Sequence, residues 1–152
     1  MMTNKLKQVL FDGCQSFVNY RLQAIQKTID EIQVSLNSET KSSAGDKHET
    51  GRAMLQLERE KAGQQLAEIQ KLNQVLLKIE TANRSKSVSL GSVVYTTKFN
   101  YFIAISAGEL KFKDEVFYAI STNTPIAKLL LGKQKEDKVT FRGQEFDVIE
   151  VR

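Results

Sequence analysis

The sequence predicts an α+β protein: an N-terminal antiparallel helical hairpin of the coiled-coil type, followed by a small antiparallel sheet domain with one short helix. Two observations lead to this prediction. Up to about residue 84 the apolar residues recur at helical spacing, whereas after residue 89 runs rich in β-branched and aromatic residues follow one another. We therefore divide the chain into a hairpin at residues 1–84 and a sheet domain at residues 85–152.

The hairpin is predicted from two apolar seams. In the first, the apolar positions step alternately by four and three residues, which is the spacing at which helices pack in a coiled coil. The positions of this first seam are Val18, Leu22, Ile25, Ile29, Ile32 and Leu36, extended backwards by Phe11 and Cys14. Those of the second seam are Leu55, Ala62, Ile69, Leu72, Leu76 and Ile79. Neither segment contains proline, so each can form an uninterrupted helix.

Residues 37–50 join the two seams and are predicted to form the tip of the hairpin. They are polar throughout and include several turn formers. Two seams joined in this way fold back on each other, over about 45 Å if each arm has about 30 residues. Asp46 and Glu49 lie within this tip, and their spacing also matches a capping box that begins the second helix.

The second half of the chain is predicted to form five strands and one helix. The expected strands are residues 92–97, 101–105, 116–120, 138–141 and 145–151. Arg142 and Gly143 separate the last two and favour a tight hairpin turn. The helix should begin after Thr124, a good N-cap residue, with Pro125 at its first position, and should end at Gly132.

Composition and charge exclude several classes of function. The net charge is +4, and residues 1–84 hold 12 basic and 10 acidic side chains against 10 and 8 in residues 85–152. Neither half has the basic block that drives tight DNA binding, so we expect no sequence-specific contact with DNA. The sequence contains no apolar run of about 18 residues, Met1–Leu10 does not have the pattern expected of a signal peptide, and Cys14 is the only cysteine. We therefore expect a cytoplasmic protein without membrane contact.

Four segments carry a resemblance to a known family. Ile120–Lys133 reads ISTNTPIAKLLLGK and resembles the IS-x-x-SP-I-A-x-x-L-x-GK signature of the Gre-type transcript cleavage factors, the GreA/GreB family. Glu136–Val139 and Phe146–Val151 are similar to the GD-x-V turn and Y-x-I-x-x-V strand that follow it in that family. At the tip, Gly45–Glu49 keeps the glycine, aspartate and glutamate of the family's GD-L-S-E sequence. The resemblance covers the chain in the family's order.

The resemblance implies a fold, a function and partners. Its sheet domain is FKBP-like and docks on bacterial RNA polymerase, while the hairpin tip enters the secondary channel and stimulates the polymerase's intrinsic cleavage of backtracked RNA. The partners are then the polymerase and, indirectly, the nascent RNA. Asp46 and Glu49 would help to hold a second Mg²⁺ in the polymerase active site, since this hard ion prefers carboxylate oxygens. Two carboxylates on a solvated loop bind Mg²⁺ poorly, so we expect neither a bound ion nor enzymatic activity in the isolated chain.

The same resemblance suggests further site residues. Candidates for contacts with RNA or the channel are Lys41, Lys47 and Arg52. Candidates for docking on the polymerase rim are Ser121, Thr124 and Pro125. Each set also has a purely structural interpretation. Basic residues commonly occupy solvated helix faces, and the second set also forms the helix cap described above.

The sequence is also compatible with other functions. Lys47 and His48 replace the family's leucine and serine, and Gly51–Ala53 replaces its small, acidic and aromatic positions. The chain could therefore dock in the same way and inhibit or modulate transcription without cleavage. An FKBP-like fold also suggests a prolyl isomerase, but such pockets are commonly floored by tryptophan and this chain has none. A plain coiled-coil interaction module is a further alternative.

Overall fold

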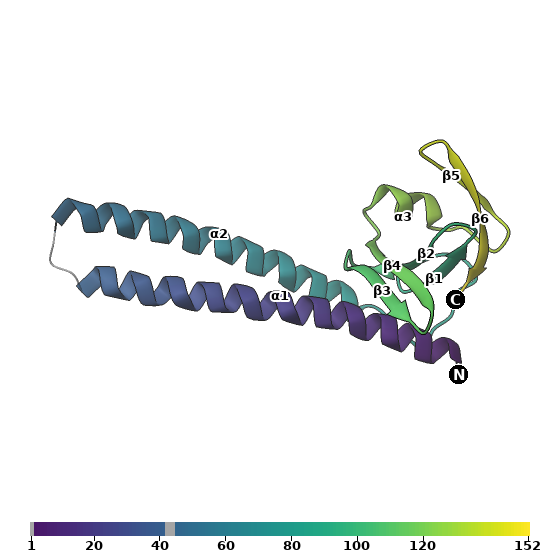
Figure 1. Cartoon of the computed structure of the whole chain (residues 1–152), viewed down its shortest axis with the longest axis horizontal. Coiled ribbons are helices and arrows are strands. Elements are labelled where there is room, and N and C mark those ends of the chain that lie inside the picture. Colours follow the sequence, from purple (N-terminus) through teal and green to yellow (C-terminus); the bar gives the residue numbers. More distant parts are fainter. Residues whose placement is uncertain (1, 42–44) are drawn as a thin grey trace. The chain divides into compact units, whose positions relative to one another are not determined.

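The computed structural model describes residues 2–41 and 45–152, and the side chains of residues 5–39 and 50–152 (Figure 1). Two long helices come first, α1 (Met2–Lys41) and α2 (Gly45–Leu77), and strands and a short helix follow. The contacts divide the chain into two compact units. Met1–Phe17 and Gln74–Arg152 form the sheet unit, and Val18–Asn73 form the hairpin unit. The predicted α+β class is confirmed, whereas the division at residue 84 rests on periodicity and stays a prediction.

In the hairpin unit the two helices lie side by side and run in opposite directions (Figure 1). Each buries one stripe of apolar side chains. The buried members are Val18, Ile25, Ile29, Ile32 and Leu36 of α1, and Ala62 and Ile69 of α2. Near the end of the hairpin at which α1 ends and α2 begins, the Arg52 guanidinium donates a hydrogen bond to the backbone oxygen of Leu36, with Nη1 and O 3.2 Å apart. The predicted antiparallel hairpin is therefore confirmed, and its own seam is its core.

The described part of the sheet unit contains six strands. They are β1 (Val93–Thr96), β2 (Asn100–Ala104), β3 (Gly108–Phe112), β4 (Glu115–Ser121), β5 (Lys138–Phe141) and β6 (Gln144–Val151). Their order in the sheet is β3-β4-β2-β1-β6-β5. Five of these strands match the predicted ranges to within about a residue or two.

The sheet is mixed rather than wholly antiparallel, so the predicted strand arrangement is wrong at one pair. Strands β2 and β4 run parallel, with Asn100 beside Phe117 and Ala104 beside Ser121. The chain reverses once between β2 and β3 and again between β3 and β4. Strand β4 therefore runs in the same direction as β2 and lies between β2 and β3. No sequence pattern specifies this insertion, because it depends on contacts between distant segments.

Strand β3 is the one strand that the sequence did not predict. It lies at an edge of the sheet and is mostly exposed. A two-residue turn joins it to β4, with Lys113 at φ 56°.

The turn predicted at Arg142 and Gly143 is present between β5 and β6, and both residues have positive φ, 52° and 79°. That pair of angles is typical of the type I′ turn, which matches the twist of the flanking strands.

The short helix α3 (Pro125–Leu130) contributes to the core of the sheet unit and contacts β5. The buried residues of that core come from α3, the sheet and the segment before β1: Val88, Val94, Ile103, Leu130, Val139, Phe146, Val148 and Val151. The predicted start of α3 is confirmed, because Thr124 is its N-cap and Pro125 its first residue. Gly132 follows the helix with φ 84°, a conformation that glycine adopts without strain. The FKBP-like character of this domain stays a prediction.

The first turns of α1 pack within the sheet unit. Leu6, Leu10 and Cys14 are fully or almost fully buried. Gly13 allows the close approach, because a Cβ atom at this position would lie 2.9 Å from Cδ2 of Leu110 in β3. A side chain there would have to displace Leu110, so the absence of one is part of the packing.

We expect Gly13→Ala to lower the free energy of unfolding, by up to about 2 kcal/mol. The cost of overpacking, about 1–3 kcal/mol, exceeds the gain in helix propensity of about 1 kcal/mol. The matched control is Gly63→Ala in α2, where a new Cβ would meet only the mobile end of Arg59. That variant should stabilise by about 0.5–1 kcal/mol. Urea denaturation of both variants checks this, and equal stabilisation by the two substitutions would contradict the packing.

Candidate functional site

The predicted tip residues lie where the two long helices end and begin. Lys41 is the last residue of α1, and Asp46, Lys47 and Glu49 belong to the first turns of α2. Residues 42–44 and all four of these side chains lie outside the described part of the chain. Helix α2 begins at Gly45, one residue before the predicted cap at Asp46. The capping box, the carboxylate pair and the roles of the two lysines therefore stay predictions.

Arg52 is the one predicted tip residue with a described side chain. It is half-buried, and Nη1 donates to the backbone oxygen of Leu36. At the same level, a Cβ atom on Gly51 would lie 3.6 Å from Oε1 of Glu39, so α1 and α2 approach closely here. Arg52 thus links α2 to the backbone of α1 near the C-terminal end of that helix. This structural role exists independently of any contact with RNA.

The predicted docking loop is organised around its own backbone. The Thr124 hydroxyl donates to the carbonyl of Ser121 at 2.9 Å and accepts from the amide of Ala127 at 3.3 Å. The Ser121 hydroxyl accepts from the amide of Asn123 at 3.3 Å. Both hydroxyls therefore stabilise the turn and the start of α3. Pro125 is exposed and presents its ring at the first position of the helix. The structure confirms the cap, and docking stays a prediction.

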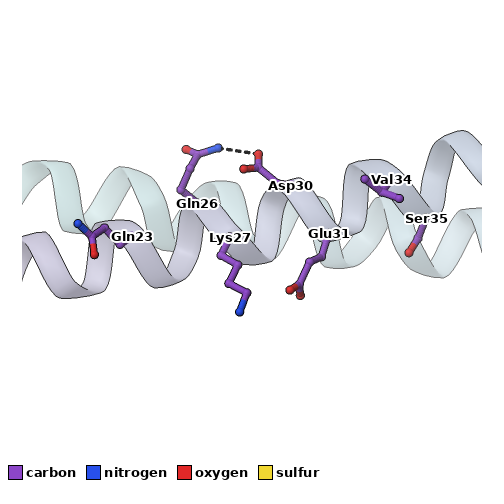
Figure 2. A pocket seen from close by; sticks show the side chains of 7 residues that line it. All are labelled: Gln23, Gln26, Lys27, Asp30, Glu31, Val34 and Ser35. Atoms are coloured by element: carbon purple, nitrogen blue, oxygen red, sulfur yellow. Dashed lines mark hydrogen bonds between the residues drawn. The ribbon is translucent and has the colours of Figure 1, made fainter.

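A shallow hollow lies along the outside of the hairpin (Figure 2). Its seven lining residues all come from α1: Gln23, Gln26, Lys27, Asp30, Glu31, Val34 and Ser35. Figure 2 shows Gln26 and Asp30 pointing to one side of the helix, joined by a 3.0 Å hydrogen bond, and Lys27 and Glu31 pointing to the other. Because the polar groups diverge, this surface does not have the convergent chemistry of a binding site.

No group of three or more histidine, cysteine, aspartate or glutamate side chains that could hold a metal ion occurs among the residues described. Within residues 2–41 and 45–152, no helix is long and apolar enough to cross a membrane.

Cys14 lies in the buried part of α1 and is not accessible to solvent. Burial raises the pKa of its thiol to about 11, and a hydrogen bond from the backbone of Ile105 acts in the opposite direction. A protonated, buried thiol is a poor nucleophile. Cys14 is therefore a packing residue, as predicted, but it packs in the sheet unit rather than on the seam of the hairpin unit.

Comparison with known proteins identifies no family for this chain. No protein-family model matches it, and no curated protein matches it. Among solved structures it is similar to one titled "Structure of the transcription factor Gfh1", with 18% sequence identity over 91% of this chain and 92% of that chain and a TM-score of 0.35. A likeness at that identity and score carries no argument about function.

The Cys14 thiol makes stability dependent on pH in the alkaline range. The unfolded thiol loses its proton near pH 9 and the folded thiol near pH 11. The free energy of unfolding should therefore fall between pH 9 and pH 11, by on the order of 1–2 kcal/mol from this residue. The difference between the urea-unfolding profiles of the native chain and Cys14→Ala isolates this contribution. A difference that stays constant from pH 8 to pH 11 would show that the thiol titrates normally.

Loss of the α3 cap should destabilise the sheet unit. Thr124→Ala removes the acceptor of the Ala127 amide and is expected to cost about 0.5–2 kcal/mol in unfolding free energy. Thr124→Ser keeps the hydroxyl and should retain most of the stability. Chemical denaturation of both variants measures this. If the alanine and serine variants were equally stable, the cap would not contribute to the fold.

Proposed function

We propose that this chain is a bacterial transcription elongation factor that binds RNA polymerase and inserts its hairpin tip into the secondary channel. There it stimulates the polymerase's own cleavage of backtracked RNA. The observation that carries this proposal is a self-supporting two-helix hairpin with Asp46 and Glu49 at the start of its second helix. The proposal also rests on the resemblance of Ile120–Lys133 to the Gre-type signature.

The narrow, self-contained form of the hairpin unit supports such an insertion. Two packed helices make a rod about 20 Å across, and the α1 part of the unit, residues 18–41, spans about 36 Å. The buried stripe needs no third element, because each helix covers the apolar face of the other. A narrow, self-contained rod can enter a channel that would exclude a globular domain.

The chemistry proposed for the tip follows from its residue types. Asp46 and Glu49 offer carboxylate oxygens, the ligands that Mg²⁺ prefers, and the polymerase would supply the remaining ligands. A second Mg²⁺ in that active site supplies an activated water and stabilises the leaving oxygen of the RNA. The role of this chain would be to deliver and orient the two carboxylates. We propose that it is not an enzyme by itself.

The sheet unit is the proposed docking element. Its candidate surface is the loop with Ser121 and Thr124, together with Pro125 and the exposed side chains of Leu129 and Leu131 beside it. The hydrogen bonds around Thr124 hold the loop in one conformation before binding. A preorganised loop loses little conformational entropy on binding, which favours a role in recognition.

A regulator without cleavage activity is the second candidate. It is favoured by Lys47 and His48, which place a cation and an imidazole between the two carboxylates in sequence. A cation close to the carboxylates would compete with a metal ion for them. This function shares the docking and the insertion, so it differs only in the outcome at the polymerase active site.

A stalled, backtracked elongation complex of bacterial RNA polymerase tests the proposal. We expect the native chain to accelerate shortening of the RNA. Asp46→Asn with Glu49→Gln should return the rate to that of polymerase alone, since amides are poor Mg²⁺ ligands and carry no charge. The matched control is Glu58→Gln with Glu60→Gln, which neutralises two exposed carboxylates farther along α2. Its activity should equal that of the native chain.

The other outcomes of this assay are equally informative. Inhibition of RNA synthesis without shortened RNA would contradict the cleavage proposal and support the regulator. Absence of binding to the polymerase, measured on the same samples, would contradict both candidates. Equal loss of cleavage in the tip variant and in the control would show that overall charge, rather than the tip pair, is responsible.

A further inference from the structure

We infer that the sheet unit holds a binding site for a small phosphate-bearing anion, in a cavity beside the buried side chain of Lys7. The cavity has a volume of about 330 Å³ and a mostly polar lining. The lining residues that matter here are Lys7, Lys78, Arg84, Ser89 and Ser92. They come from α1, from the segment that begins where α2 ends, and from the turn before β1. All of its lining residues belong to the sheet unit, and the proposal does not depend on polymerase binding.

Lys7 is an unusual residue to find in this position. It is 3% exposed, and it is the only charged side chain among the buried residues that the structure describes. Its ammonium group donates to the backbone oxygen of Asn83 at 2.5 Å, which is a neutral partner. Burying a charge without an opposite charge is costly. An anion in the adjoining cavity would supply the missing charge.

The electrostatics around Lys7 point in the same direction. The pKa of Lys7 is lowered, first by burial and second by the positive charge of Arg84. A lowered pKa means that the folded state disfavours the charged form, so protonated Lys7 reduces stability at neutral pH. A bound anion would oppose both causes of the lowered pKa. Its negative charge would stabilise the buried ammonium group and would offset the repulsion between that group and the guanidinium of Arg84.

The wall of the cavity carries a net positive charge. Lys7, Lys78 and Arg84 line it against one carboxylate, that of Glu80. Glu80 already accepts a 2.7 Å hydrogen bond from the side chain of Asn83. Arg84 lies 3.3 Å from a carboxylate oxygen of Glu150, and its side chain is 58% exposed. An exposed pair of that kind is weak, so the guanidinium can turn towards a ligand at little cost.

A tight turn brings hydroxyl groups to the same wall. The amide of Ser92 donates to the carbonyl of Ser89 at 3.0 Å, and Gly91 takes φ 91°. Only glycine fits there comfortably, because a Cβ would also lie 3.2 Å from Ile79. The two serine hydroxyls are 3.5 Å apart. Hydroxyl groups can donate to phosphate oxygens, and arginine and lysine provide the charge that phosphate binding requires.

The volume of the cavity limits the kind of ligand that it can hold. The volume is near the lower end of the range for small-molecule pockets, about 300–1,000 Å³. It suits inorganic phosphate or the phosphate group of a mononucleotide, which share the same chemistry.

Isothermal titration calorimetry of the full chain tests the site, with inorganic phosphate and adenosine monophosphate as probes at constant ionic strength in chloride. We expect saturable binding of one anion per chain. Arg84→Gln and Lys78→Gln should each weaken it by at least about tenfold, the loss typical of a hydrogen bond to a charged group. Glu80→Gln should tighten it. The matched control is Lys86→Gln, an exposed charge close in sequence that does not line the cavity.

The outcomes of this titration distinguish a specific site from nonspecific attraction. Saturable binding that weakens in Arg84→Gln but not in Lys86→Gln supports the site, and the tighter probe identifies the source of the phosphate. Binding that fails to saturate, or that falls equally in both variants, is nonspecific attraction and overturns the proposal. Lys7→Met removes the buried charge, and circular dichroism shows whether it folds. If it folds and still binds as tightly as the native chain, Lys7 is not part of the site.

Discussion

The buried stripe of α1 is the constraint on which the rest of the structure depends. The same helix contributes Leu6, Leu10 and Cys14 to the sheet unit and a row from Val18 to Leu36 to the hairpin unit. Fully burying an aliphatic side chain is worth about 1.5–3 kcal/mol, so each end of the stripe contributes substantially to the unit in which it lies. Helix α1 is uninterrupted from Met2 to Lys41. Both compact units therefore need this one helix.

Features with a local signal could be predicted from the sequence. The alternating steps of four and three residues located the seam, since side chains at that spacing share one face of a helix. Thr124 and Pro125 located the start of α3, and Arg142 with Gly143 located the hairpin turn, because each position requires a particular backbone conformation or hydrogen bond. In every one of these cases the physical cause lies within a few residues of its effect.

Features that depend on distant contacts could not be predicted. The parallel pairing of β2 and β4 arises from the insertion of β4 beside β2, which no local pattern specifies. Strand β3 has a weak pattern because it lies exposed at an edge. Lys7 reads in the sequence as one more charge on an amphipathic helix, and only the folded chain shows it buried next to a cavity. For the same reason the sequence showed nothing of the proposed anion site.

For the candidate tip, the sequence is more informative than the structure. Asp46 and Glu49 were found by resemblance and by spacing, whereas the described side chains begin at Thr50 in α2. What the structure adds is the described part of the hairpin: a paired seam, and the hydrogen bond from Arg52 to the backbone oxygen of Leu36. If the chain acts on RNA polymerase as proposed, the length of the hairpin decides whether the tip reaches the polymerase active site.

Shortening the hairpin by one heptad in each arm tests that claim directly. Deleting residues 26–32 and 57–63 removes opposing blocks, retains the register of the seam and shortens the rod by about 10 Å. The measurement is RNA cleavage and polymerase binding by this variant, side by side with the native chain. The account predicts that binding through the sheet unit persists while the stimulation of cleavage disappears. Cleavage at the native rate by the shortened chain would contradict it.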